Sequence, residues 1–147
     1  MCRSWTARAR AVSALTLALA SAGCATGRGG QPPVLEGTTW RIVQVDGAEV
    51  RAPADVNMAP HFRILSAEGQ VHGATGCNRF SGRYRADGAS VAFGTLTTTG
   101  MACRDGALQD QEQRILDVLD AADGYRIDGR WLWLMVAGQH RMTLEVW

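Results

Sequence analysis

The 147-residue sequence has no lysine, no excess of either charge and no long hydrophobic run. All 15 basic residues are arginine. This usage fits either bidentate capture of carboxylates and phosphates or the codon bias of a GC-rich genome, and we favour the second interpretation. Beyond residue 23 the chain carries 12 Arg and 14 Asp plus Glu, which gives a net charge of −2. This balance excludes the basic excess expected of a nucleic-acid-binding domain.

Motifs that mark common reaction centres are also missing. The sequence has no G-x-S-x-G, no P-loop and no G-x-G-x-x-G. The three histidines, His61, His72 and His140, are far apart and form no H-E-x-x-H pair, and no two cysteines have C-x-x-C spacing. We therefore predict no catalytic residue, no cofactor and no metal site, although a nucleophilic Cys77 assisted by a histidine remains a possibility that spacing does not address.

The first 23 residues are typical of an export signal. Three arginines precede an apolar run over residues 11–22, which is shorter than the roughly 20 residues that cross a bilayer. Residues 21–24 (SAGC) resemble a bacterial lipoprotein signal, although Ser21 stands where a larger aliphatic residue is usual. We predict lipidation of Cys24 and, since Ala25 follows, an outer-membrane lipoprotein facing the periplasm. The alternative is simple cleavage and a secreted or periplasmic soluble protein.

The rest of the chain divides into a tether and one domain. Residues 24–33 are rich in Gly, Thr, Gln and Pro, a composition that favours a flexible segment. Residues 34–147 are enough for one hydrophobic core.

The domain reads as short strands and one helix. Strand patterns at 38–45, 61–66, 80–85 and 131–136 are joined by turn signals such as Asp46-Gly47 and Asp87-Gly88. Apolar residues at steps of three and four predict a helix over 105–122, with Asp105 as its cap and Gly124 closing its far end. We predict an α+β domain, a mainly antiparallel curled β-sheet (barrel-like meander) with one packed α-helix.

Two further patterns make predictions about the helix and one strand. Both faces of 131–136 are apolar, so we expect the helix to cover one face and the curled sheet the other. The helix carries four acidic residues that resemble a metal cluster, but the helical spacing places three of them on a solvated face. They are Asp110, Glu112, Asp117 and Asp120.

Two cysteines lie within the domain, 26 positions apart: Cys77 in GATGCNRFSG and Cys103 in TTTGMAC. In an exported chain they suggest a disulfide, with buried free thiols and metal ligation as alternatives. A bridge of this span contributes about 3.5 kcal/mol by loop entropy. We expect positive φ at Gly76 and Asn78, and a brace from Glu112 to an arginine, either Arg79 or Arg104.

These segments together resemble the META domain, also called the HslJ-like family of bacterial exported proteins and lipoproteins. The matching stretches are LEGTTWRIVQVDG, GATGCNRFSGRY, TTTGMAC, the helix containing Glu112, and YRIDGRWLWL. The resemblance implies a small β-rich domain with a packed helix and no established catalytic activity; family members are loosely linked to stress response, drug tolerance and motility. We assign structural roles to the motif residues Gly76, Asn78, Arg79, Phe80, Met101 and Glu112.

Two functional hypotheses follow. The first is a non-catalytic envelope module, tethered to the membrane through Cys24, that binds an envelope protein or peptide; a protease-inhibitor-like β-barrel is a variant of it. The second is a small-ligand carrier or enzyme with a pocket inside the rolled sheet. The exposed arginines Arg79, Arg83 and Arg85 fit an anion patch, but we favour the solvated face of a half-buried strand.

Overall fold

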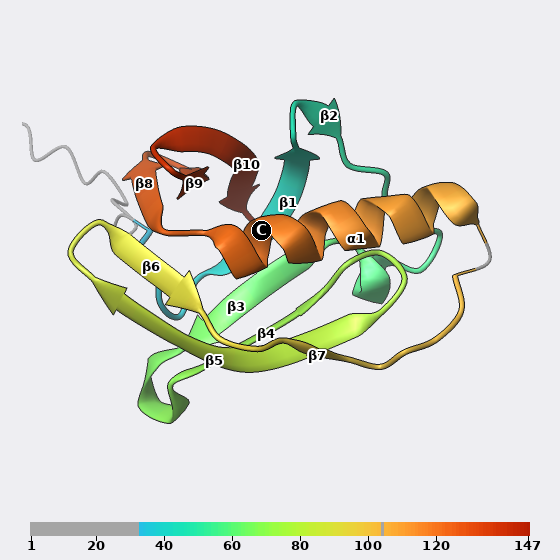
Figure 1. The fold of residues 1–147 in the computed structure, drawn as a ribbon, viewed down its shortest axis with the longest axis horizontal. Coiled ribbons are helices and arrows are strands. Elements are labelled where there is room, and N and C mark those ends of the chain that lie inside the picture. Colours follow the sequence, from blue (N-terminus) through green and yellow to red (C-terminus); the bar gives the residue numbers. More distant parts are fainter. Residues whose placement is uncertain (1–32, 104) are drawn as a thin grey trace, which may run out of the picture. The chain divides into compact units, whose positions relative to one another are not determined.

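The computed structural model describes residues 33–103 and 105–147 (Figure 1). The predicted signal peptide, Cys24 and the tether up to residue 32 lie outside the described residues, as does Arg104. The strands are β1 (Thr39–Val45), β2 (Ala48–Glu49), β3 (His61–Leu65), β4 (Gln70–Ala74), β5 (Arg79–Asp87), β6 (Ser90–Phe93), β7 (Thr97–Thr98), β8 (Gly124–Asp128), β9 (Trp131–Val136) and β10 (Gln139–Val146). The helix α1 (Gly106–Ala121) lies between β7 and β8, and two 3₁₀ turns, η1 (Val56–Met58) and η2 (Ser66–Glu68), flank β3.

The strands form one antiparallel sheet that closes on itself. Its order is β10-β9-β8-β6-β5-β4-β3-β1-β2, and a further β1–β10 pairing joins the two sides into an eight-stranded barrel. In that pairing Trp40 lies opposite Val146, and Ile42 lies opposite Leu144. The predicted α+β class, with a curled antiparallel sheet and one helix, is confirmed.

The barrel has one weak seam, between β6 and β8. A single pair, Ser90 opposite Gly124, joins these two strands in the sheet. The C-terminal end of α1 lies beside β6 and β8 in Figure 1, and α1 contacts β6, β1 and β9. Ile115, Val118 and Leu119 of α1 are buried in the core. The helix therefore supplies the apolar surface that strand pairing leaves uncovered at the seam.

Local turn chemistry explains most of the connections. Asp46 and Gly47 both have positive φ, of 50° and 78°, as a two-residue type I′ hairpin turn requires. Asp105 caps α1 by accepting a hydrogen bond from the backbone N–H of Ala107. Gly124 does not close the helix as expected, because Ala122 ends α1 in an extended conformation and Gly124 already belongs to β8.

Side chains fill the interior of the barrel. The indole N–H of Trp40, at 0% exposure, donates to the backbone carbonyl of Leu35. The other large side chains at or below 2% exposure come from both walls of the barrel and from α1: Ile42, Phe62, Ile64, Ile115, Leu119, Leu132, Leu134, Met142 and Leu144. No helix within the described ranges is long and apolar enough to cross a membrane.

The outer face of β9 differs from the expectation. Leu132 and Leu134 point into the core, but Trp131 is 37% exposed and Trp133 is half-buried. Arg126 lies over the ring of Trp133, with its guanidinium carbon 4.5 Å from the ring centre. Long polar side chains, rather than a second layer of sheet, cover this apolar face.

Gly73 on β4 is the tightest point of the barrel wall. A Cβ atom there would overlap the backbone oxygen of His61 and lie 2.5 Å from the ring of Phe80. We expect Gly73→Ala to lower the free energy of unfolding by about 1–3 kcal/mol, because a packed interior yields little to an added methyl group. Gly106→Ala is the matched control: no atom lies within 4 Å of its Cβ position, and alanine favours helix by up to about 1 kcal/mol. Urea unfolding of both variants measures the difference, and equal stabilities would contradict this account of Gly73.

Candidate functional site

A disulfide between Cys77 and Cys103 joins the β4–β5 turn to the loop that precedes α1. The two Cα atoms are 5.6 Å apart and the S–S bond is 2.02 Å long. The structure thus contains the bridge that the sequence favoured over free thiols and metal ligation. The bridge attaches the N-terminal end of the helix to the barrel wall.

Asn78, next to Cys77, is the centre of a hydrogen-bond network. Its side-chain oxygen accepts from the backbone N–H of Met101 at 2.7 Å and from the hydroxyl of Thr99 at 2.6 Å. Its side-chain nitrogen donates to the carbonyl of Met101 at 3.0 Å and to Glu112 at 2.9 Å. Asn78 is 2% exposed, and it is not among the residues with positive φ. The positive φ expected from the sequence is therefore confirmed at Gly76 and wrong at Asn78.

Glu112 connects this turn to α1. One carboxylate oxygen accepts from the Asn78 side chain, and the other accepts from the Asn78 backbone N–H and from the hydroxyl of Thr75. The expected brace to Arg79 does not form; Arg79 is exposed at the start of β5. The reason is geometric: Glu112 faces the open N–H groups of the turn, which a carboxylate satisfies well. We call the disulfide, Asn78 and Glu112 the clasp.

Gln111 is a buried polar residue that the sequence analysis missed. Its side-chain oxygen accepts from the backbone N–H of Arg51 at 2.7 Å, and its nitrogen donates to the carbonyls of Arg51 and Thr75. Gly76 has a φ of 102°, and a Cβ there would lie 3.1 Å from the Gln111 side chain. The helix thus holds both the β4–β5 turn and the loop after β2. The only sequence signal for this role is the position of Gln111 on the helix, directly before Glu112, where the helical repeat turns its side chain towards the barrel.

The other motif residues serve packing or lie exposed. Phe80 is 3% exposed and packs in the core, whereas Met101 is 55% exposed beside the disulfide. Among the described residues, the only group of three potential metal ligands is Cys77, Cys103 and Glu112. Its two sulfurs are joined in the disulfide, and a metal requires thiolates. The arrangement in this structure therefore positions a turn and is not suited to holding an ion.

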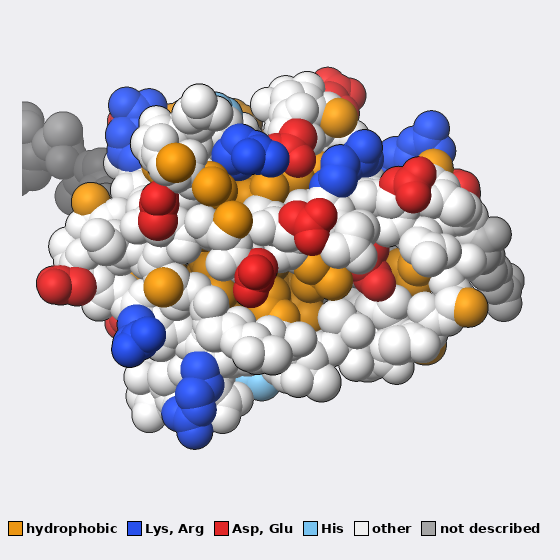
Figure 2. Space-filling view, in the orientation of Figure 1, with side chains coloured by type: hydrophobic (Ala, Val, Ile, Leu, Met, Phe, Trp, Pro, Cys, Tyr) orange, Lys and Arg blue, Asp and Glu red, His pale blue; other side chains and the backbone are white. Residues whose placement is uncertain are grey.

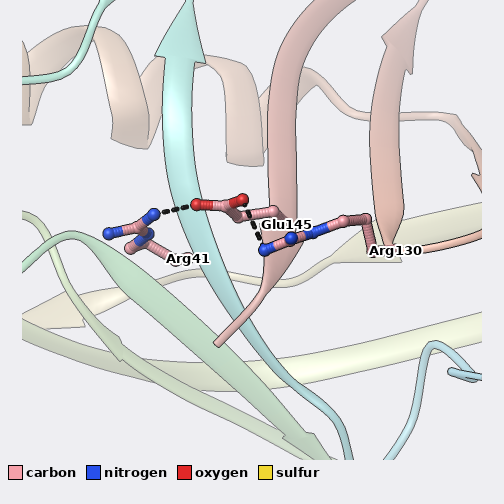
Figure 3. A network of polar contacts seen from close by, with 3 residues as sticks. All are labelled: Arg41, Arg130 and Glu145. Atoms are coloured by element: carbon pink, nitrogen blue, oxygen red, sulfur yellow. Dashed lines mark hydrogen bonds and ion pairs between the residues drawn. The ribbon is translucent and has the colours of Figure 1, made fainter.

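A second polar cluster lies on the outer wall, on β10. Glu145 is 7% exposed and forms ion pairs with Arg41 of β1 and with Arg130 of the β8–β9 turn, the latter at 2.9 Å (Figure 3). The arginine side chains are 49% and 63% exposed, so water screens much of the attraction. No local pattern predicts this cluster, because the three residues meet only through strand pairing, with Arg41 directly opposite Glu145.

One tyrosine has a shifted pKa. Burial, together with a hydrogen bond to the carboxylate of Glu36 and the charge of that carboxylate, raises the pKa of Tyr84 to about 12. On the β1–β2 turn, Asp46 raises the pKa of the Arg141 guanidinium. Neither group lies in the clasp.

The META domain model matches residues 33–146. The chain belongs to the META domain family. The match confirms the resemblance that the sequence analysis drew from five stretches spread over the domain. A comparison with curated proteins returned no match.

Solved structures share the META domain fold of this chain. A protein from Burkholderia xenovorans, determined by NMR, is 27% identical, with a TM-score of 0.60 over 77% of this chain and 83% of that one. A second NMR structure is 21% identical with a TM-score of 0.61, covering 76% and 91%. A DUF4847 family protein from Bacteroides vulgatus is 16% identical with a TM-score of 0.51, covering 77% and 94%. The last two show the fold alone.

A test of the clasp starts from Glu112. In Glu112→Gln an amide NH₂ replaces one of two oxygens that each face a donor of Asn78. We expect a loss of about 1–3 kcal/mol of unfolding free energy, the cost of a buried donor left unsatisfied. Asp120→Asn, an exposed carboxylate on the same helix, should change stability by less than about 0.5 kcal/mol. Denaturant unfolding of the oxidised protein compares the two, and a neutral Glu112→Gln would argue against the clasp.

The raised pKa of Tyr84 predicts how stability changes at alkaline pH. The folded state keeps the Tyr84 phenol neutral up to a pKa of about 12, while the unfolded phenol ionises near pH 10. Stability from this group is therefore present below pH 10 and falls as the pH rises from 10 to 12. Urea unfolding at stepped pH should show a smaller decline in Tyr84→Phe than in the unmodified chain. Identical declines would show that Tyr84 does not carry this linkage.

Proposed function

We propose that this META domain is a non-catalytic recognition module of the bacterial envelope, tethered to the outer membrane through a lipid on Cys24. The export-type N-terminal sequence and the disulfide support an oxidising compartment, because such bonds persist outside the cytoplasm. The partner is an envelope protein or peptide, bound through the outer wall of the barrel.

The observation that carries the proposal is the contrast between the filled interior and the aromatic outer wall. Trp40, Phe62 and Ile115 are each at 0% exposure, so the centre of the barrel offers a ligand no room. Trp131, in contrast, is 37% exposed on β9, beside half-buried Trp133. Tryptophan and arginine are the residue types that dominate binding energy at protein interfaces.

The charge of this wall favours an acidic partner. Arg126 lies over Trp133 and Arg130 over Trp131, with distances to the ring centres of 4.5 and 5.8 Å. Arg126 forms no ion pair with any described carboxylate. An acidic peptide segment with an apolar side chain would pair with the free guanidinium and cover the indole ring.

The face that carries α1 is less suited to this role. Acidic and basic side chains are interspersed over it in Figure 2. A surface of mixed charge favours solubility over a specific contact.

A second candidate function, small-ligand transport, is favoured by one hollow. It has a volume of about 630 Å³ and lies at the β6–β8 seam, lined in part by Tyr84, Val91 and Ala122. This volume lies in the range of about 300–1,000 Å³ that is typical of ligand sites. The hollow is on the surface of the barrel, whereas the carrier hypothesis requires an interior pocket. We therefore rank small-ligand transport second.

The test combines capture with intact mass. The full chain, purified from envelope extracts after photo-crosslinking, should carry a crosslinked partner. We expect Trp131→Ala to lower the amount of partner recovered by tenfold or more. Trp147→Ala, which removes another exposed tryptophan at 52% exposure, is the matched control and should retain it. The intact mass of the same sample should report acylation at Cys24.

Three outcomes would contradict the proposal. They are equal capture by the two variants, no partner above background, and turnover of a substrate by the purified chain. An unacylated, cleaved N-terminus would remove the tether and leave a secreted module.

A further inference from the structure

A small hollow on the outer wall of the barrel is lined largely by basic side chains. It has a volume of about 250 Å³ and lies where β1, β3, β4 and β5 run side by side. The polar lining residues are Thr39, His61, Arg63, His72 and Arg79, and no carboxylate lines the hollow.

Strand register brings these residues together from four separate strands. Thr39 lies opposite Arg63, and Arg63 lies opposite His72, in one row across the sheet. In the adjacent row, His61 lies opposite Ala74, which in turn lies opposite Arg79. Outward-facing side chains of adjacent rows are near neighbours on a sheet, so both guanidinium groups reach the same hollow.

The two arginines of the hollow have no carboxylate partner in the described structure. Arg41, Arg51, Arg130 and Arg141 each pair with a carboxylate. Arg63 and Arg79 are exposed and, like Arg126, take part in none of these ion pairs. Both guanidinium groups are therefore open to an anion that enters the hollow.

The hydroxyl adds a directional donor, and two imidazoles lie beside it. His61 donates through Nδ1 to the carbonyl of Ala59 at 2.7 Å, and Nε2 of His72 lies 2.9 Å from the side-chain oxygen of Gln70. Each ring is thereby held in place; its second nitrogen accepts in the neutral imidazole and donates to an anion when the ring carries a second proton. The edge of the Trp147 ring packs against His61, with ring centres 4.8 Å apart.

The size and the donor set together indicate the ligand class. A volume of 250 Å³ is below the range of about 300–1,000 Å³ for drug-sized ligands, so the hollow suits a small group. Two guanidinium forks and a hydroxyl surround it with more donors than the two oxygens of a carboxylate use. A tetrahedral phosphate accepts hydrogen bonds on several oxygens at once and pairs bidentately with arginine.

We propose that the hollow formed by Thr39, His61, Arg63, His72 and Arg79 binds a phosphate group. This site is separate from the Trp131 surface and does not depend on a protein partner. The phosphate is either free inorganic phosphate or the headgroup of a membrane lipid, and the two sources share the same chemistry at the hollow.

The experiment uses the full oxidised chain and two arginine variants of equal charge. Inorganic phosphate is titrated at low ionic strength while backbone amide NMR shifts are followed. The expected result is saturable binding with the largest shifts at His61, Arg63, His72 and Arg79. Arg79→Gln should weaken binding about tenfold, whereas Arg85→Gln on the same strand, outside the hollow, should leave it unchanged within about twofold.

A second arm distinguishes the sources. Vesicles of phosphatidylglycerol in phosphatidylcholine, or of phosphatidylcholine alone, are sedimented with each variant. If Arg79→Gln, and not Arg85→Gln, loses binding to the anionic vesicles, the source is a lipid headgroup; saturable phosphate binding without vesicle binding identifies the free ion. No saturable binding in either arm, or equal losses in the two variants, would overturn the site.

Discussion

The weak seam between β6 and β8 is the constraint on which the rest of the fold depends. Two adjacent strands joined by one residue pair cannot exclude water by strand pairing alone, so α1 packs beside them. The clasp decides where α1 begins, since Cys103 is linked to Cys77 and Glu112 holds the Asn78 turn. The cysteine motif therefore helps to complete the barrel, because it positions the helix that packs beside the weak seam.

Local patterns in the sequence were enough to predict the architecture. Alternation, Asp-Gly turns and the three- and four-residue steps of the helix are encoded within a few neighbouring residues, and the structure has strands, turns and α1 at the predicted places. Gly124 was misassigned because a glycine after a helix usually ends it, whereas here the chain extends directly into β8. The prediction that a second sheet layer covers the outer face of β9 was wrong, because the side chains of Arg126 and Arg130 cover its tryptophan rings instead.

Apart from the Cys77–Cys103 bridge, contacts between distant segments were beyond the reach of the sequence. Glu112 was expected to brace Arg79 or Arg104, but its carboxylate accepts from Asn78, 34 positions away, and not from Arg79. Gln111 and Glu145 were overlooked because nothing in their neighbourhood distinguishes them from exposed polar residues. Their roles come from register and helical phase, which are properties of the completed barrel. The same holds for the basic hollow, whose four strands contribute one or two residues each.

The pairing of β1 with β10 has a consequence for biosynthesis. Trp40 and Val146 are opposite each other, so β1 pairs early with β2 and β3 but finds β10 only when the last strand has been made. Contacts this distant along the chain slow folding, and a nascent barrel lacking β10 exposes an open edge that can pair with other chains. The domain is thus most vulnerable to aggregation in the interval before its final residues emerge, when a holding chaperone would have the greatest effect on yield.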